Sequence, residues 1–505
     1  MSGTDFGRRE FLKLAGAVAA GSAVSAALVG CGAAGGQESS GGSATGDRVL
    51  GWTDVEFAHD VDVLVIGAGP SGLAAAYTAA KAGANTLCVE KQLSYGGDAA
   101  NAANGWVAPE SKVCADLRPE EAITMEDCLA AFKATYADNQ YYYEVVEAWQ
   151  YGLDSWFSTV VYDFGVKFME GGHPCSYGGF FLPPDGVGEA SEIWGTIFEN
   201  VQAAGAQFIF NMKADTFIVG ENDQITGLRC WDSANSKWVD IKAKSIIIAT
   251  GGFASNQEMI AKYYPEYYNK GCITSTSMGE GINLGLSVGA ATYGIEGGVL
   301  PDGNQGAWGP CNYNPHLENI HVAQTMGRSF SILPTTGKRF YDETMVHEAP
   351  FECLGAGAYS WWAIWDDQIT YGPNAKSVQR AGDEWVTGNT VEELATKMKM
   401  PVNVIQEVFD DYARICENGV DDEFGRTMFL ENLEPPYYAL QVYPVRYKTH
   451  GGLKVSKLDE VLDTNDQPIP GLYAAGVAAG TVHILPAGGS GVVAGQAAAD
   501  YAASL

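Results

Sequence analysis

The chain has 505 residues, enough for two or three domains with substantial apolar cores. Its 61 acidic residues outnumber its 30 lysines and arginines, so its formal net charge is -31 at neutral pH. Such an acidic surface argues against nucleic acid and anionic lipid as partners and favours a basic electron carrier. The ten cysteines lack the close spacings of zinc, haem or iron–sulfur sites, so we expect no metal site.

The first 54 residues are typical of an export signal and a linker. Residues 8–13 read Arg-Arg-Glu-Phe-Leu-Lys, a twin-arginine pattern, and a short apolar run follows. The run ends at Cys31 in the pattern of a bacterial lipobox, although a plain signal peptide with an incidental cysteine is the alternative. We expect a twin-arginine lipoprotein signal over 1–30 and a Gly/Ser-rich flexible tether over 31–54. The protein would be lipid-anchored at Cys31 on the extracytoplasmic face of a bacterial cell membrane, with no other membrane contact.

The chain continues with the sequence of a βαβ dinucleotide-binding unit. Val61–Ile66 is a short apolar run with β-branched residues, which predicts a buried strand, and the glycine-rich loop Gly67–Gly72 follows at once. A helix is predicted over Leu73–Ala82, and a second strand, Thr86–Val89, ends at Glu90. The glycines allow a pyrophosphate to approach the helix N-terminus, and the acid can accept ribose hydroxyls.

Further glycine-rich turns lie far along the chain and favour FAD over NAD. They occupy residues 96–105, 245–252, 278–281, 471–476 and 488–491, and helices are predicted over 282–291 and 492–503. An extended FAD needs backbone contacts along its whole length, and distant glycine-rich turns can supply them. An NAD-binding domain does not need these additional turns. The amides that open the last helix would face the flavin's pyrimidine carbonyl and stabilise the anionic reduced flavin.

Two more motifs are Gly337-Lys338-Arg339-Phe340 with Asp342-Glu343, and Gly451-Gly452 before Leu453. From about Val61 to Leu505, the chain resembles the flavoprotein family of soluble fumarate reductases, urocanate reductases and 3-ketosteroid dehydrogenases. The resemblance implies an α/β fold with a Rossmann-like FAD domain of the glutathione-reductase type, built from residues 55–300 and 441–505. Residues 301–440 would form an inserted α+β substrate-capping domain, in which 390–418 is a polar helical segment.

Together, the glycine-rich segments and the resemblance give one set of expected FAD contacts. These residues are Ala68, Gly69, Ser71, Gly72, Glu90, Lys91, Gly97, Asp98, Ala99, Asn104, Gly105, Ala214, Thr250, Gly251, Glu280, His450, Gly476, Val477, Gly491 and Val492. FAD is the expected cofactor.

The resemblance also implies a proton-transfer residue four positions after Glu343. His347 stands there in this chain, where fumarate reductases carry arginine and ketosteroid dehydrogenases carry tyrosine. A histidine can donate or accept a proton near neutral pH, so we expect His347 to be the catalytic acid. A surface histidine is the alternative, with Tyr341 as the second candidate acid. Arg339 is expected to be a structural residue, either in an ion pair or bound to backbone, and not a catalytic one.

Several departures from the fumarate reductase pattern bear on the substrate. Leu485–Gly489 lacks the arginine with which those enzymes clamp a carboxylate, Lys448 replaces a histidine, and Ala323 and Met326 replace a Glu/Arg proton relay. We therefore expect a larger, less charged enone or unsaturated lactone in preference to a small dicarboxylate. The candidate donors to the substrate oxygen are Arg446, Lys448, His450 and His483, each of which could instead be a solvated basic residue.

Aromatic residues of the cap could line an apolar substrate pocket, but such residues are more often core. We assign at least half of this set to the cap core: Tyr359, Trp361, Trp362 and Trp365.

The expected reaction is hydride transfer from the flavin to a carbon–carbon double bond conjugated to a carbonyl group. No haem or flavin-carrier segment is recognisable, so electrons would come from a separate quinol-linked or cytochrome donor at the membrane or outside the cytoplasm. The resemblance then favours a respiratory-type reductase. Three alternatives remain: a ketosteroid-type dehydrogenase running oxidatively, a non-catalytic flavin electron-transfer lipoprotein, and an amine or amino-acid oxidase.

Overall fold

The structure is a computed structural model. It describes residues 48–49, 55–101, 106–108, 111–136, 140–168, 174–175, 178–181, 191–220, 223–269, 271–272, 276–295, 308–310, 327–344, 349–371, 385–449, 451–480 and 484–505. The expected export signal and nearly all of the tether lie outside these residues. Within them, no helix combines the length and apolar character needed to span a membrane.

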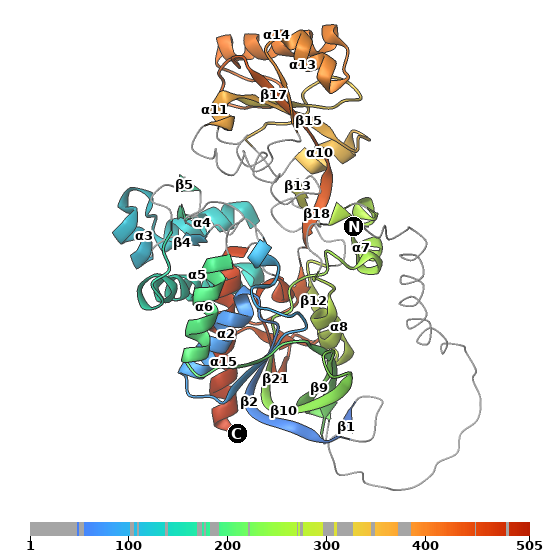
Figure 1. Ribbon diagram of the computed structural model, residues 1–505. Coiled ribbons are helices and arrows are strands. Elements are labelled where there is room, and N and C mark those ends of the chain that lie inside the picture. Colours follow the sequence, from blue (N-terminus) through green and yellow to red (C-terminus); the bar gives the residue numbers. More distant parts are fainter. Residues whose placement is uncertain are drawn as a thin grey trace, which may run out of the picture. The chain divides into compact units, whose positions relative to one another are not determined.

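The larger sheet has a parallel centre in the order β7-β3-β2-β10-β21. These strands are β2 (Phe57–Ile66), β3 (Thr86–Val89), β7 (Gln207–Ile209), β10 (Lys237–Ile248) and β21 (Pro468–Ala474). Figure 1 labels β2, β10 and β21 among them. All four residues of β3 and the last four of β2 are buried, because parallel strands have both faces covered. The apolar runs predicted to be buried strands are therefore confirmed.

Strand β10 changes partner halfway along its length. Its first half pairs antiparallel with β9 (Ile225–Asp232), and its second half pairs parallel with β21. A Cβ on Gly227 would lie 2.3 Å from the carbonyl oxygen of Ile241, so the β9–β10 contact requires glycine there. Three more strands complete this sheet: β1 (Arg48–Val49), β8 (Met212–Val219) and β20 (Glu460–Leu462).

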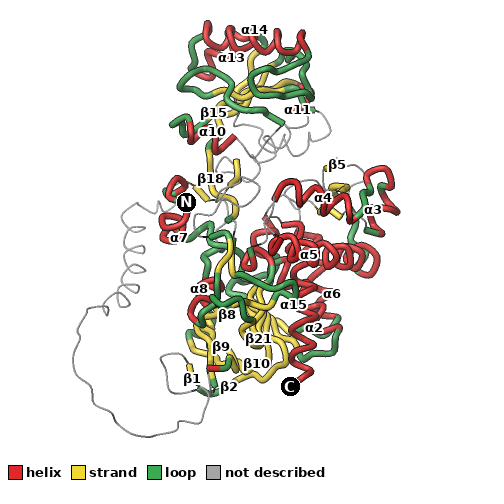
Figure 2. The backbone as a smooth tube through the Cα atoms, turned by 180° about the vertical axis from the view of Figure 1, so that it is seen from behind, coloured by secondary structure: helices red, strands yellow, loops and turns green. Residues whose placement is uncertain are grey.

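Helices cover one face of this sheet (Figure 2). They are α2 (Pro70–Lys81), α5 (Gln140–Ser158), α6 (Ser191–Ala203) and α15 (Ile484–Ser504). Of these, α2 and α15 are rich in alanine and glycine. Helix α15 packs closely against both α2 and α5. A Cβ on Gly495 would lie 2.6 Å from the carbonyl oxygen of Ala75, which shows how closely the backbones of α15 and α2 approach.

The prediction that the last helix opens after a glycine turn at 488–491 is wrong. Helix α15 already begins at Ile484, so these glycines lie inside it. A Cβ on Gly489 would lie 1.9 Å from the carbonyl oxygen of Trp149 in α5, and one on Gly491 would lie 2.2 Å from that of Ser71 in α2. The glycines are needed for close helix packing rather than for a turn, so the amides near 492 do not open a helix.

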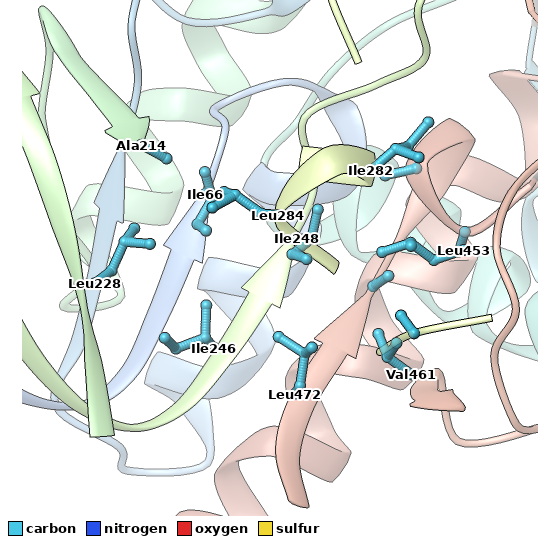
Figure 3. Close-up of a cluster of buried hydrophobic side chains, with 14 of the residues drawn as sticks. Ile66, Ala214, Leu228, Ile246, Ile248, Ile282, Leu284, Leu453, Val461 and Leu472 are labelled. Atoms are coloured by element: carbon cyan, nitrogen blue, oxygen red, sulfur yellow. The ribbon is translucent and has the colours of Figure 1, made fainter. Parts of the chain in front are cut away.

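A second apolar cluster fills the other side of the sheet (Figure 3). Its side chains come from the sheet, from α8 (Glu280–Ser287) and from the strands that follow residue 451; the labelled ones are Ile66, Ala214, Leu228, Ile246, Ile248, Ile282, Leu284, Leu453, Val461 and Leu472. Helix α8 was expected over 282–291 but begins at Glu280 and ends at Ser287. The chain turns there, and Gly289 adopts a φ of +86°, in the left-handed region.

A separate four-stranded antiparallel sheet has the order β14-β15-β17-β16. The strands are β14 (Ser329–Ile332), β15 (Trp361–Asp366), β16 (Val386–Gly388) and β17 (Tyr437–Val442). Trp361 and Trp365 are fully buried and Trp362 is half-buried, whereas Tyr359 is 71% exposed. The assignment of at least half of these aromatics to the core is confirmed.

The expected helical segment 390–418 consists of two helices, α13 (Val391–Met398) and α14 (Val402–Asn418). They are separated because Lys399 has a φ of 59° and Pro401 precedes α14. The apolar faces of both helices pack against β14, β15 and β17.

The remaining described elements are short or peripheral to the two larger sheets. They are η1 (Gly97–Asn101), β4 (Trp106–Ala108), α3 (Lys112–Leu117), η2 (Pro119–Glu121), α4 (Met125–Tyr136), η3 (Thr159–Asp163), β5 (Pro174–Cys175), β6 (Gly178–Phe181), α7 (Gln257–Tyr263), η5 (Pro265–Tyr267), β11 (Gly271–Cys272), β12 (Thr292–Tyr293), β13 (Trp308–Pro310), α10 (Ala349–Gly355), α11 (Asp367–Thr370), β18 (Pro444–Lys448), β19 (Gly452–Leu453) and η7 (Gly476–Ala479).

Candidate functional site

A pocket enclosing about 1180 Å³ opens at the carboxyl ends of the parallel strands. Ile66 at the end of β2, Val89 at the end of β3 and Ala249 just after β10 form part of its wall. Ligands of open α/β sheets bind at this edge. The other lining residues are Gly67, Gly69, Pro70, Ser71, Glu90, Lys91, Gln92, Gly97, Asp98, Ala99, Met212, Lys213, Ala214, Thr250, Gly251, Gly252, Thr276, Ser277, Glu280, Thr449, Val477 and Ala487.

The loop between β2 and α2 brings backbone to the pocket wall. Gly67 has a φ of +104°, and a Cβ on Gly72 would lie 1.8 Å from the carbonyl oxygen of Gly67, so this tight turn requires both glycines. A Cβ on Gly69 would meet no protein atom within 4 Å. A Cβ on Gly97 would lie 3.2 Å from the Cα of Gly69. The two glycine-rich loops therefore converge, as the sequence predicted.

Glu90 is held rigidly at the end of β3. Its side chain is 8% exposed, and its two carboxylate oxygens accept the backbone N–H groups of Ala68 and Gln92, each at 2.8 Å. A carboxylate has about four lone-pair sites, so two remain for the pocket side. This geometry suits an acid that accepts ribose hydroxyls.

Charged side chains are ordered along the same wall. Lys91 Nζ donates to Glu280 Oε2 at 2.7 Å and to the carbonyl oxygen of Thr276 at 2.5 Å, while Lys213 Nζ lies 3.9 Å from Glu280 Oε1. The carboxylate of Asp98 accepts the hydroxyls of Thr276 and Ser277. These bonds tie the loop after β3 to the segment before α8.

Thr250 presents a buried polar atom at the pocket. Its Oγ1 is buried and has no hydrogen-bond partner among the described residues, although Thr250 lines the pocket. A Cβ on Gly281 would lie 2.2 Å from this oxygen, so glycine leaves room for it. Buried hydroxyls are rarely left unpaired, so Thr250 Oγ1 is positioned to bind a ligand.

The structure brings together twelve of the predicted FAD contacts on the pocket wall: Gly69, Ser71, Glu90, Lys91, Gly97, Asp98, Ala99, Ala214, Thr250, Gly251, Glu280 and Val477. Five other predicted contacts lie behind the wall. Ala68 and Gly72 are buried within the first loop, a Cβ on Gly476 would lie 2.5 Å from Ser71 Oγ, and Gly491 and Val492 lie inside α15. These five residues are not among those that line the pocket.

The remaining predicted site residues are placed only in part. Asn104, Gly105, His347, His450 and His483 lie outside the described residues. Arg446 and Lys448 belong to β18, which pairs with β11 and β13.

Tyr341, the second candidate acid, is a core residue packed against the four-stranded sheet of β14 to β17. It is 2% exposed, and its hydroxyl lies 3.4 Å from Ser331 Oγ. Burial, reinforced by the charge of Glu343, raises the pKa of this phenol far above its ordinary value. These properties do not favour Tyr341 as a proton donor to a substrate.

Arg339 forms the predicted structural ion pair. Its Nη2 donates to Glu343 Oε2 at 2.7 Å and to Asp421 Oδ2 at 2.8 Å, and all three side chains are almost fully buried. Glu343 also accepts the backbone N–H of Ser331 at 3.0 Å and Nη1 of Arg426 at 3.0 Å. The motif that precedes His347 is therefore fixed at Glu343, which is bonded to β14 and to Arg426.

Sequence reasoning missed several pocket residues. Thr276 and Ser277 stand directly before the predicted Gly279-Glu280 turn, and their hydroxyls were a usable signal. Thr449 stands directly before His450 and accepts the backbone N–H of Phe253 at 3.0 Å. Lys213 had no local signal, because only the sheet brings β8 to the pocket.

Comparison with known proteins identifies the fold and the cofactor. Residues 62–493 match the family described as FAD binding domain. The chain belongs to this family. The flavoprotein is 28% identical over 460 residues to the vinyl phenol reductase of Lactiplantibacillus plantarum, covering 83% of this chain and 90% of that protein.

Two further comparisons also relate the chain to reductases. The flavoprotein is 26% identical over 454 residues to the urocanate reductase of Eggerthella lenta, covering 83% of this chain and 70% of that protein. The open conformation of a flavocytochrome c3 fumarate reductase superposes with a TM-score of 0.71 at 25% identity, covering 89% of this chain and 79% of that chain. The expected resemblance and the α/β FAD fold are confirmed.

The cofactor of the flavoprotein is FAD, and the chain is an FAD-dependent oxidoreductase related to enzymes that act on carbon–carbon double bonds. The pocket suits this cofactor. Converging glycine loops leave open space at Gly69, and Glu90 has lone pairs free for ribose hydroxyls. Thr250 presents a buried oxygen that no described residue pairs with.

Proposed function

We propose that this flavoprotein reduces a carbon–carbon double bond conjugated to a carbonyl group in an enone, unsaturated lactone or enoate. The vinyl phenol, urocanate and fumarate enzymes to which it is similar are all named as reductases, which supports reduction over dehydrogenation. When bound and reduced, FAD supplies the hydride. The protein must hold the double bond against the flavin, donate a proton to the second carbon and stabilise charge on the carbonyl oxygen.

The observation that carries the substrate class is the apolar character of the pocket beside the start of α15. Ala487 lines the pocket, and the sequence Ile484–Gly491 contains no basic residue. A bidentate arginine clamp would be the strongest way to hold a carboxylate here. Its absence from this segment supports a larger, less charged acceptor over a small dicarboxylate. Similarity to a vinyl phenol reductase, whose named substrate is a phenol, is consistent with this choice.

We assign the proton donor to His347. The support is its position four residues after Glu343, which Arg339 and Arg426 fix within the cap. His347→Ala should retain FAD and lower turnover by about a hundredfold or more, the scale of a lost general acid. Tyr341→Phe is the matched control, because its hydroxyl is buried, and it should leave turnover unchanged. Wild-type turnover in His347→Ala would remove His347 from the mechanism.

Arg446, Lys448, His450 and His483 stay candidates for stabilising negative charge on the substrate's carbonyl oxygen. Their sequence positions support this role, since Thr449, between Lys448 and His450, lines the FAD pocket. Single alanine variants would identify the donor as the one that lowers the turnover number while FAD stays bound.

We also propose that the enzyme works on the extracytoplasmic face of the membrane, anchored at Cys31, and accepts electrons from a quinol-linked or cytochrome donor. The twin-arginine and lipobox patterns over 1–31 support this location, and the net charge of -31 suits a basic carrier. Cys31→Ala should release the protein from the membrane fraction. Continued membrane attachment would contradict a lipid anchor at Cys31.

An anaerobic assay with reduced viologen and the FAD-loaded enzyme tests the substrate class. The panel comprises enone steroids, unsaturated lactones, a cinnamate, a vinyl phenol, urocanate and fumarate. An enone or lactone should oxidise the dye at least about tenfold faster than fumarate. Fumarate as the fastest acceptor would overturn the substrate class, and a panel with no acceptor would overturn the reductase function in favour of an electron carrier.

A further inference from the structure

A buried carboxyl group lies behind the FAD pocket. Asp459 immediately precedes β20 and is fully buried, and its carbonyl oxygen accepts the backbone N–H of Ala474 at the end of β21 at 3.0 Å. Its side chain therefore lies near the carboxyl end of a central parallel strand. None of the predicted site residues included it.

The carboxyl of Asp459 connects three elements. Trp149 Nε1 of α5 donates to Oδ1 at 2.8 Å, and Ser490 Oγ of α15 lies 3.0 Å from Oδ2. Ser490 Oγ in turn accepts the backbone N–H of Gly476, the first residue of η7, at 3.0 Å. The carboxyl thus holds α5 and α15 and, through Ser490, the turn after β21.

This chain of bonds ends at the pocket. A Cβ on Gly476 would lie 2.5 Å from Ser71 Oγ, and the next residue, Val477, lines the pocket together with Ser71. Ala487, three residues before Ser490 on α15, also lines it. A displacement of Ser490 would therefore be transmitted directly to the wall that receives the cofactor.

The environment of Asp459 disfavours a charge. The hydrogen-bond partners that the described residues provide for its carboxyl, an indole N–H and a hydroxyl, are both neutral. Burial raises the pKa of Asp459 well above its ordinary value, and the bonds from Trp149 and Ser490 offset this only in part. An ionised carboxylate without a cation is costly in such a site.

We propose that Asp459 is a positioning residue for the bound FAD and that it acts as an uncharged carboxylic acid, holding Ser490 and the Gly476 turn at the pocket wall. In this arrangement Oδ1 accepts the indole N–H of Trp149, and Oδ2 accepts the hydroxyl of Ser490. This inference rests on the FAD cofactor and not on the proposed substrate.

Asp459→Asn and Asp459→Ala in the full chain test the proposal through FAD affinity and the midpoint potential of the bound flavin. Asparagine keeps the size and the neutral state of the side chain. Its Oδ1 can accept from Trp149 and its Nδ2 can donate to Ser490 Oγ once the serine hydroxyl proton turns away, so both quantities should stay at wild-type values. Alanine should weaken FAD binding by about tenfold, the effect of losing a buried hydrogen bond, and shift the midpoint potential. Infrared spectra of the wild type should contain a protonated-carboxyl band that Asp459→Asn lacks.

Trp149→Phe and Trp156→Phe provide a matched pair on α5. Both indoles are buried, but Trp156 Nε1 has no hydrogen-bond partner among the described residues, whereas Trp149 Nε1 binds Asp459. Only Trp149→Phe should shift the flavin potential, and this comparison stands even if Asp459→Ala does not fold. Equal potentials in the two variants would overturn the positioning role. A potential shift in Asp459→Asn equal to that of Asp459→Ala, or an unchanged infrared band, would overturn the uncharged state.

Discussion

Arg426 Nη1 donates to Glu343 Oε2 at 3.0 Å, and both side chains are fully buried. The same nitrogen donates to the carbonyl oxygen of Ser329 in β14 at 2.7 Å. This ion pair therefore joins β14 to the motif that precedes His347. A buried pair of this kind adds little net stability over an apolar pair, but removal of one partner leaves a charge uncompensated.

Arg426→Met should lower the free energy of unfolding by about 3 kcal/mol, because Glu343 loses one of its two buried cations. FAD stoichiometry should not change, since every residue lining the pocket lies outside 327–442. Urea denaturation and flavin absorbance measure the two effects. Arg414→Met is the control, because Arg414 pairs with Asp411 at 70% exposure and should cost less than about 1 kcal/mol. Equal stability of the two variants would contradict the anchoring role.

Gly69→Ala should separate cofactor binding from folding. The added methyl meets no protein atom within 4 Å, and the φ of −77° suits alanine, so the stability of the FAD-free protein should not change. The methyl occupies the pocket wall where the pyrophosphate approaches, so FAD affinity should fall by about tenfold or more. Fluorescence titration with FAD gives the affinity. Gly355→Ala is the control, because it also adds a methyl to open space, and it should bind FAD normally. Unchanged FAD affinity in Gly69→Ala would contradict the placement of the pyrophosphate beside Gly69.

Thr250→Val should weaken FAD binding without destabilising the FAD-free protein. The hydroxyl has no partner among the described residues, so its removal costs the free protein nothing, whereas loss of its bond to the cofactor should lower affinity about five- to tenfold. Thr449→Val should behave oppositely, because its hydroxyl accepts the N–H of Phe253, and stability should fall by about 1–3 kcal/mol. Thermal unfolding and FAD titration of both variants check the contrast. A destabilised Thr250→Val would show that its hydroxyl already has a protein partner.

The raised pKa of Asp459 predicts a pH dependence of stability. In the unfolded chain this carboxyl ionises near pH 3.9, whereas in the folded protein it keeps its proton to a higher pH. Its contribution is therefore fully present below the unfolded pKa and is lost as pH rises towards the folded pKa, by up to about 1.4 kcal/mol per pH unit. The free energy of unfolding of the wild type minus that of Asp459→Asn should fall as pH rises above about 4. A constant difference, or one that grows with pH, would show that Asp459 is ionised in the fold.

The FAD pocket was largely predictable because its residues follow local patterns. Gly69, Gly97 and Glu90 each stand at the end of an apolar strand or in a glycine turn, so sequence order alone indicates the sheet edge where they meet. Helix α15 shows the opposite case. Its glycines resemble a turn in sequence. In the fold, however, they lie inside the helix, where the carbonyl oxygens of Trp149 and Ser71 leave no space for a Cβ. Those carbonyl groups belong to α5 and α2, which come close to α15 only in the folded chain.

Buried polar groups were the least predictable feature. Asp459 lies among charged and polar neighbours in sequence, and nothing local distinguishes it from a solvated acid. Its burial depends on Trp149, 310 residues earlier in the chain. By contrast, a structural role for Arg339 was predicted from its motif, and the structure adds Glu343, in the same motif, as its ion-pair partner.

Single-turnover oxidation of the reduced, FAD-loaded enzyme tests the central claim most directly. The enzyme is reduced anaerobically without excess reductant and mixed with the enone or lactone that the dye assay selects. If the protein is a reductase of this class, oxidised flavin absorbance returns and one saturated product molecule forms per FAD. The reductase function would be contradicted if no unsaturated carbonyl compound reoxidised the flavin while a basic electron carrier did so.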